Sequence, residues 1–197
     1  MKKLLITGFD PFDGGAVNPS SQAVMSLPDV IGDYMLCKLT IPTVFGKAAA
    51  RVLAEAEEFQ PDVILCVGLA GGRDAVTPER IAVNIRDART ADNEGNQPVG
   101  QFVNPDGPAA YFSTVPVENM AKAIRDQKIP AAVSNTAGTF VCNDVLYTLL
   151  HHFSGSSTQV GFIHVPRTPE LGEPSLPLAQ ISAALSSVNS SQRSQSS

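Results

Sequence analysis

The sequence predicts an α/β fold, a three-layer α/β/α sandwich around a twisted, mostly parallel mixed sheet. Apolar segments alternate with segments of helical period along the chain, and two of the apolar segments are continuous, as in strands buried on both faces of a sheet. The chain has 197 residues and is 43% hydrophobic, enough to bury about 70% of its unfolded surface in one core. We therefore expect a single domain over residues 1–188, with five or six strands and about five helices.

The first half of the chain contains the two continuous apolar strands. The first is followed by a loop rich in Gly, Pro and Asp, and then by Asn18 and Pro19, which suit the N-cap and the first position of a helix. The predicted elements are a strand at residues 3–9, a helix at 18–27, a half-buried strand at 34–41, a helix at 43–60 and a buried strand at 62–72.

The second half contains a long polar segment between an irregular strand at residues 80–89 and the next helix. It runs from residue 90 to about 114, and a loop of this length in a compact domain is typically functional or disordered. The later elements are a helix at 116–128, a strand at 131–135, a helix at 139–153, a strand at 159–166 and a helix at 176–188. The tail, residues 189–197, is too polar to pack and is expected to fray.

Composition and charge narrow the classes of partner. The formal net charge is −5 and no Lys/Arg cluster is present, so neither a nucleic acid nor an anionic membrane is an expected partner; a small neutral or peptidic ligand fits better. The apolar run at the N-terminus is too short for a signal peptide, and no run approaches the roughly 20 residues of a membrane helix. Three cysteines cannot all pair internally, so we expect a cytoplasmic protein.

Cys142 is the cysteine whose position indicates chemistry. Cys37 and Cys66 lie within apolar strands and are expected to be inert packing residues. Thr139 suits an N-cap, which would place Cys142 in the first turn of a helix, where free backbone N–H groups favour a thiolate.

A nucleophilic thiol needs a proton partner, and only three histidines are present. His151 and His152 lie late on the helix that carries Cys142, roughly 14 Å along its axis, and cannot reach the thiol. His164 ends the strand that follows this helix, so it is the candidate base. A third group would orient the imidazole, and two carboxylates near strand ends remain open for that role, Glu79 and Asp92.

Three phenylalanines should converge near the same edge of the sheet. Phe9 and Phe12 follow the first strand, and Phe140 precedes Cys142 by two residues. Flat rings suit a small, flat substrate group. The glycine-rich segments GFDPFDGG and GLAGGRD lack the spacing of a dinucleotide or phosphate loop, so no nucleotide cofactor is expected.

Long blocks of the chain together resemble the pyroglutamyl peptidase type I family, also called pyrrolidone-carboxylate peptidases. The resemblance runs from residue 2 to about 166 and is weaker in the final helix. The blocks, in order, are ITGFDPFDGGAVNPS, VGLAGGRDAVTPERIAVNIRDAR, DNEGNQPV, GPAAYF, IPAAVSNTAGTFVCN and GFIHVP.

This resemblance implies a cysteine peptidase that removes an N-terminal pyroglutamate (5-oxoproline) from peptides, without a metal or cofactor. Motif by motif, it implies a triad of Glu79, Cys142 and His164, with Asp92 as the second candidate for the acid. It also implies a topology resembling that of nucleoside phosphorylases, and a homotetramer. Two other classes remain open: a non-catalytic small-molecule binding module and a nucleoside phosphorylase-like enzyme.

The resemblance also assigns the three phenylalanines named above, together with Leu69, to a pocket for the pyrrolidone ring. The chain departs from the family pattern at Leu69, where many members carry Gln, and at Asp144, where many carry His. Leu69 cannot donate a side-chain hydrogen bond, so its effect on lactam recognition is open. Arg89 either adds positive charge near the site or anchors the long loop.

Overall fold

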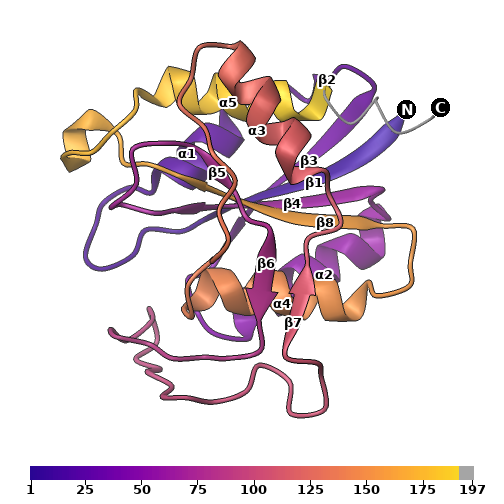
Figure 1. Cartoon of the computed structure of the whole chain (residues 1–197), viewed down its shortest axis with the longest axis vertical. Helices are drawn as coiled ribbons and strands as arrows, with labels where there is room; N and C mark the ends of the chain where they lie inside the picture. Colours follow the sequence, from indigo (N-terminus) through magenta and orange to yellow (C-terminus); the bar gives the residue numbers. More distant parts are fainter. Residues whose placement is uncertain (191–197) are drawn as a thin grey trace.

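A computed structural model describes residues 1–190 of the chain. Its centre is a six-stranded sheet in the order β2-β3-β1-β4-β8-β5, in which β3, β1, β4 and β8 are parallel and the short outer strands β2 and β5 are antiparallel to their neighbours (Figure 1). The strands are β1 (Lys2–Phe9), β2 (Val30–Ile31), β3 (Tyr34–Ile41), β4 (Val63–Leu69), β5 (Thr77–Pro78) and β8 (Gln159–Val165).

Helices cover both faces of this sheet. In Figure 1 one group of helices lies above the sheet and the other below it, which confirms the predicted three layers. The upper group is α1 (Pro19–Met25), α3 (Val117–Asp126) and α5 (Leu178–Ser190), and the lower group is α2 (Lys47–Phe59) and α4 (Val141–His152). Of the described helices, none has the length and apolar character to cross a membrane.

The alternation of side chains along β1 shows how the sequence produces two cores. Leu4 and Ile6 are buried in the cluster that includes α1, α3 and α5, whereas Leu5 and Phe9 are buried in the cluster with α2 and α4. Successive residues of a strand point to opposite faces, so a strand covered on both sides must be apolar throughout. This explains why the continuous apolar run predicted a central strand correctly.

The topology places the site at one edge of the sheet. The chain passes from β1 to β3 on one side of β1 and then returns to β4 on the other, so the carboxyl ends of β1 and β4 flank a switch point. Ligands of open α/β sheets bind in the crevice at such a point. Phe9 ends β1, Leu69 ends β4, and the register of β4 with β8 sets Gly68 opposite His164.

Two predictions about strands were wrong. Residues 131–135 form no strand and make only isolated bridges, from Ala131 to Val76 and from Ser134 to Glu79. The pairing is interrupted at Pro78, which has no N–H to donate to a ladder. The segment predicted as a loop over 90–114 also contains a strand, since β7 (Ala110–Phe112) pairs with β6 (Ile81–Val83) in a separate two-stranded sheet.

Helix ends also differ from the predictions. Helix α2 begins at Lys47 instead of residue 43, because Gly46 takes a φ of 72° that ends the preceding turn. Helix α5 extends to Ser190, so the first two residues of the predicted tail are helical. The rest of that tail, residues 191–197, lies outside the described residues.

Candidate active site

Cys142 is the second residue of α4, and the turn before it differs from the prediction. Phe140 occupies the N-cap position with extended backbone and offers no side-chain acceptor, so the first-turn N–H groups of α4 have no side-chain cap. Thr139 is not the N-cap; its hydroxyl donates to the carbonyl of Asp87 at 2.7 Å. The positive end of α4 is therefore open beside the thiol.

The two residues after Cys142 fix the start of α4 to the rest of the fold. Asn143, fully buried, accepts from the N–H of Val83 at 2.9 Å and donates to the Val83 carbonyl at 2.8 Å. Asp144, also fully buried, accepts from Arg86 Nε at 2.6 Å and from the N–H of Gly46 at 2.9 Å. Asp144, which stands where many family members carry His, therefore forms an ion pair with Arg86.

The sulfur of Cys142 lies over β4, next to His164. A Cβ added at Gly68 would stand 3.0 Å from Cys142 Sγ. Gly68 is the register partner of His164, and such partners present their side chains to the same face of a sheet. The imidazole packs against Phe162 on this face, with ring centroids 4.8 Å apart. Thiol and imidazole therefore occupy neighbouring positions on the face covered by α4.

Glu79 is the carboxylate at the imidazole. His164 Nδ1 lies 2.7 Å from Glu79 Oε1, and Glu79 is fully buried. With Nδ1 engaged as the donor to this carboxylate, Nε2 is the nitrogen free to accept a proton. Of the two carboxylates that the residues alone left open, Glu79 and Asp92, the structure has Glu79 at the imidazole.

Arg73 bonds the same carboxylate oxygen as His164. Its Nη1 donates to Glu79 Oε1 at 2.5 Å and contacts the hydroxyl of Thr77, and its Nη2 donates to the carbonyl of Thr136 at 2.9 Å. Thr136 belongs to the turn that leads into α4. One guanidinium therefore ties the acid of the site to the segment that carries the thiol.

The electrostatics indicate a neutral thiol and a neutral imidazole at rest. Burial, together with the nearby Glu79 carboxylate, raises the pKa of Cys142 to about 12. Burial lowers the pKa of His164 from 6.5, although Glu79 acts in the opposite direction. The pKa of Glu79 is lowered despite its burial, because His164 and Arg73 hydrogen-bond its charged form. These shifts act against the thiolate that the helix end favours, so a thiol at rest would lose its proton during attack.

A cavity of about 400 Å³ opens onto the sulfur. Cys142 lines it together with the four residues predicted to form a pocket, which are Phe9, Phe12, Leu69 and Phe140. The rings of Phe12 and Phe140 lie 5.2 Å apart, and Phe45 meets Phe140 edge-on at 5.2 Å. The structure thus brings together residues from the ends of β1 and β4 and from the start of α4.

Asp92 lies elsewhere and organises the long loop. Its Oδ1 accepts from the N–H groups of Glu94 and Asn96, both at 2.9 Å, and its Oδ2 accepts from the N–H of Phe45 at 3.0 Å. These bonds hold the loop against the segment after β3. Arg89 is exposed and is not among the residues lining the cavity, and its carbonyl accepts from Gln97, so its position fits the loop-anchoring alternative.

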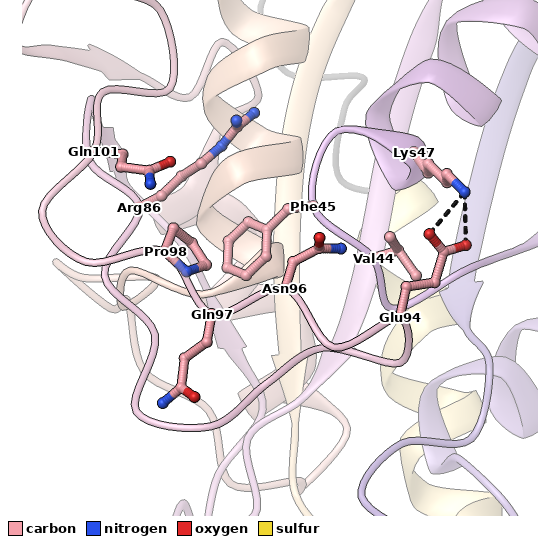
Figure 2. Close-up of a pocket in the computed structure, with 9 residues that line it drawn as sticks. All are labelled: Val44, Phe45, Lys47, Arg86, Glu94, Asn96, Gln97, Pro98 and Gln101. Carbon is pink, nitrogen blue, oxygen red and sulfur yellow. Dashed lines mark hydrogen bonds and ion pairs between the residues drawn. The ribbon is translucent and has the colours of Figure 1, made fainter.

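A second cavity, of about 460 Å³, lies beside this loop (Figure 2). Figure 2 shows Arg86 near the ring of Phe45, and Lys47 joined to Glu94 by an ion pair of 2.7 Å. The described residues that line it include neither Cys142 nor His164. The two cavities therefore differ in chemistry, although Phe45 of the second contacts Phe140 of the first.

Sequence reasoning missed several residues that build the site. Arg73 stands in the glycine-rich segment after β4, but no spacing rule shows that its side chain folds back onto Glu79. Asn143 follows Cys142 directly, and its buried amide gives no periodic signal. Among the described residues, no group of three or more His, Cys, Asp or Glu side chains is arranged to hold a metal ion.

Comparisons with known proteins agree with one another. The family profile described as pyroglutamyl peptidase matches residues 2–192. A pyrrolidone-carboxylate peptidase of Staphylococcus saprophyticus is 51% identical over 170 residues, which cover 85% of this chain and 80% of the relative.

Solved structures give the same result. The crystal structure of pyroglutamyl peptidase I from Bacillus amyloliquefaciens superposes with a TM-score of 0.95 at 45% identity, covering 98% of this chain and 97% of that one. The pyrrolidone carboxyl peptidase from Thermococcus litoralis superposes with a TM-score of 0.92 at 38% identity, covering 98% and 93%.

Proposed function

Because the chain belongs to the pyroglutamyl peptidase family of cysteine peptidases, we propose that Cys142, His164 and Glu79 are the groups with which it acts. The enzyme hydrolyses the amide bond that follows an N-terminal pyroglutamate and releases that residue from peptides. One observation supports the assignment most directly: the sulfur lies over Gly68, next to an imidazole bonded to a buried carboxylate.

The first half of the reaction forms a tetrahedral intermediate. Cys142 Sγ attacks the carbonyl carbon of the pyroglutamyl residue, and His164 Nε2 takes the thiol proton as the C–S bond forms. Glu79 stabilises the resulting imidazolium through Nδ1. The uncapped N–H groups at the start of α4 are the donors suited to the developing oxyanion, where one donor contributes about 3 to 4 kcal/mol in related acyl transfers.

The second half releases both products. The imidazolium of His164 gives its proton to the leaving amine as the C–N bond breaks. The C–N cleavage leaves a thioester on Cys142. The neutral imidazole then takes a proton from water as the water attacks this thioester, and the imidazolium returns the proton to the sulfur as the C–S bond breaks. The raised pKa of Cys142, about 12, favours a thiol over a thiolate as the restored resting form.

The cavity suits the pyroglutamyl ring in shape and polarity. A five-membered lactam is small, flat and uncharged, and the rings of Phe9, Phe12 and Phe140 offer apolar faces beside the sulfur. We assign these three residues and Leu69 to the subsite for the ring.

The experiment is release of a fluorophore from its pyroglutamyl amide, with the prolyl amide of the same fluorophore as control. Only the pyroglutamyl amide should be cleaved, and alkylation with iodoacetamide should abolish the activity in step with modification of Cys142. Full activity after complete modification of Cys142 would exclude it as the nucleophile.

We also propose that the enzyme is a cytoplasmic homotetramer. Val99, Phe102 and Phe112 are 77%, 65% and 68% exposed, and apolar side chains gathered on one loop and its strand suit a subunit interface. All three cysteines are free, which fits a reducing compartment. Sedimentation at several concentrations tests the tetramer, and Phe102→Asp should shift it toward smaller species.

A further inference from the structure

Arg167 lines the catalytic cavity and rests on a glycine. It follows β8 by two residues, and its guanidinium lies where a Cβ on Gly71 would stand: Nε, Nη2 and Cζ are 2.7, 2.9 and 3.0 Å from that point. Its carbonyl accepts from the N–H of Leu176 at 2.9 Å, which anchors the backbone. The side chain is thus placed in the cavity that holds Cys142 and Leu69.

The guanidinium lacks a carboxylate partner within the described part of the chain. Its one hydrogen bond is long, 3.5 Å from Nη1 to the carbonyl of Glu173. Asp13 lines the same cavity, and Glu170 and Glu173 are near in sequence, but none of them forms an ion pair with Arg167. A guanidinium carries five N–H donors, so most of those of Arg167 have no protein acceptor.

The two other lining side chains with N–H or O–H donors are already engaged. Asn18 donates to the carbonyl of Asp10 at 3.0 Å, and Thr43 donates to the Asp10 carboxylate at 2.8 Å. Leu69, at the end of β4, has no donor at all. Arg167 is therefore the lining residue with the most unused donors in a cavity whose other walls are largely aromatic and aliphatic.

We propose that Arg167 determines specificity by donating a charge-assisted hydrogen bond to the lactam carbonyl of the substrate, a bond that Leu69 cannot make. This rests on the proposed function. The acceptor is an oxygen of the ring itself, so the contact exists before the amide bond is cleaved and should affect binding more than turnover. Loss of one hydrogen bond to a charged group corresponds to about 10- to 100-fold in affinity.

The main test compares Arg167→Met with the unsubstituted enzyme on a fluorogenic pyroglutamyl amide, and uses 2-pyrrolidone as a competitive inhibitor. Both the KM of the amide and the inhibition constant of 2-pyrrolidone should rise about 10- to 100-fold, with kcat nearly unchanged. 2-Pyrrolidone is the lactam ring alone, so a rise in KM without a rise in its inhibition constant would place the contact outside the ring and overturn the proposal.

Two further variants separate position from charge. Gly71→Ala puts a methyl group where the guanidinium lies and should displace it, raising both constants while the charge stays. Leu69→Gln in the Arg167→Met background should restore part of the lost affinity by supplying an amide donor. The matched control is Arg51→Met, whose arginine pairs with Glu55 on α2 away from the cavity and whose kinetics should not change.

The outcomes distinguish this inference from the proposed function. If the unsubstituted enzyme fails to cleave the pyroglutamyl amide, the function itself is wrong. If it cleaves normally and Arg167→Met, with an unchanged melting temperature, keeps both constants, only the role of Arg167 is wrong.

Discussion

His164 Nδ1 lies 2.7 Å from Glu79 Oε1 in a pair whose carboxylate is fully buried and whose histidine is only 5% exposed. Burial keeps water from replacing Glu79 there, so the imidazole Nδ1 depends on this carboxylate for its hydrogen bond, whereas the carboxylate also accepts from Arg73. The carboxylate fixes the tautomer of the imidazole and supports its charged form during proton transfer. The first prediction tests this dependence.

Glu79→Gln should lower turnover by up to about 10⁴-fold, the loss seen when the acid of a catalytic triad is replaced by its amide. The amide cannot stabilise the imidazolium of His164. Asp92→Asn should be milder and act through the loop, since Asp92 bonds Glu94, Asn96 and Phe45 and not the imidazole. Turnover and melting temperature of both variants decide the question. A near-normal Glu79→Gln beside an inactive, well-folded Asp92→Asn would reverse the assignment.

Cys142→Ala and Cys142→Ser should fold normally and lose hydrolysis. The hydroxyl of serine has a much higher pKa than a thiol, and neutral His164 cannot activate it to the same degree. Cys66→Ala is the matched control: this thiol is fully buried, its pKa is raised to about 12 by burial, and activity should persist. Wild-type rates from Cys142→Ala would exclude the thiol mechanism.

The reaction of Cys142 with iodoacetamide should still accelerate as the pH rises from about 7 to 9.5, since a thiol of pKa about 12 stays protonated through that range. A resting thiolate–imidazolium pair would instead react at a constant rate over this range. Mass spectrometry of the labelled peptide measures the rate, and the Cys142→Ala variant gives the background from Cys37, whose pKa is raised to about 11. A flat profile would contradict the neutral resting pair.

Leu69→Gln should lower the KM for pyroglutamyl amides with little change in kcat. Leu69 lines the cavity but takes no part in the Cys142–His164–Glu79 proton path, so an added amide donor acts on binding. Steady-state kinetics of this variant provide the measurement. An unchanged KM would show that position 69 does not contact the lactam.

The sequence predicted the elements whose signals are local. The apolar run of β4 and the helical period of α2 each depend on neighbouring residues, so both were predicted correctly apart from their ends. Strands β5 and β7 have two and three residues and owe their pairing to distant segments, so no local pattern revealed them.

The site could be predicted in its positions but not in its interactions. Spacing and chain order placed Cys142 and His164 at one edge of the sheet, where the structure has them. The choice between Glu79 and Asp92 depended on which carboxylate the fold turns toward the imidazole, and that is a tertiary property. The place of Cys142 on α4 also does not show that burial and the Glu79 carboxylate raise its pKa, because both depend on residues distant in the sequence.

The last prediction concerns Arg73, which donates to Glu79 Oε1 at 2.5 Å and whose charge lowers the pKa of His164. In the unsubstituted enzyme the pKa of His164 is lowered from 6.5, so the imidazole is still a neutral base at pH 6.5. The value of kcat/KM should therefore persist as the pH falls through 6.5. Arg73→Gln removes the cation, so the pKa of His164 should rise and the acidic limb of kcat/KM should move to higher pH.

Arg73→Lys keeps the charge but loses the planar guanidinium that bonds both Glu79 and Thr136. The acidic limb of its kcat/KM profile should therefore stay near that of the unsubstituted enzyme, while kcat falls. The profiles are measured from about pH 5 to 8, beside melting temperatures at each pH. A merely structural role would lower kcat and melting temperature without moving the limb. An unmoved limb in a folded Arg73→Gln would therefore show that the charge of Arg73 does not tune His164.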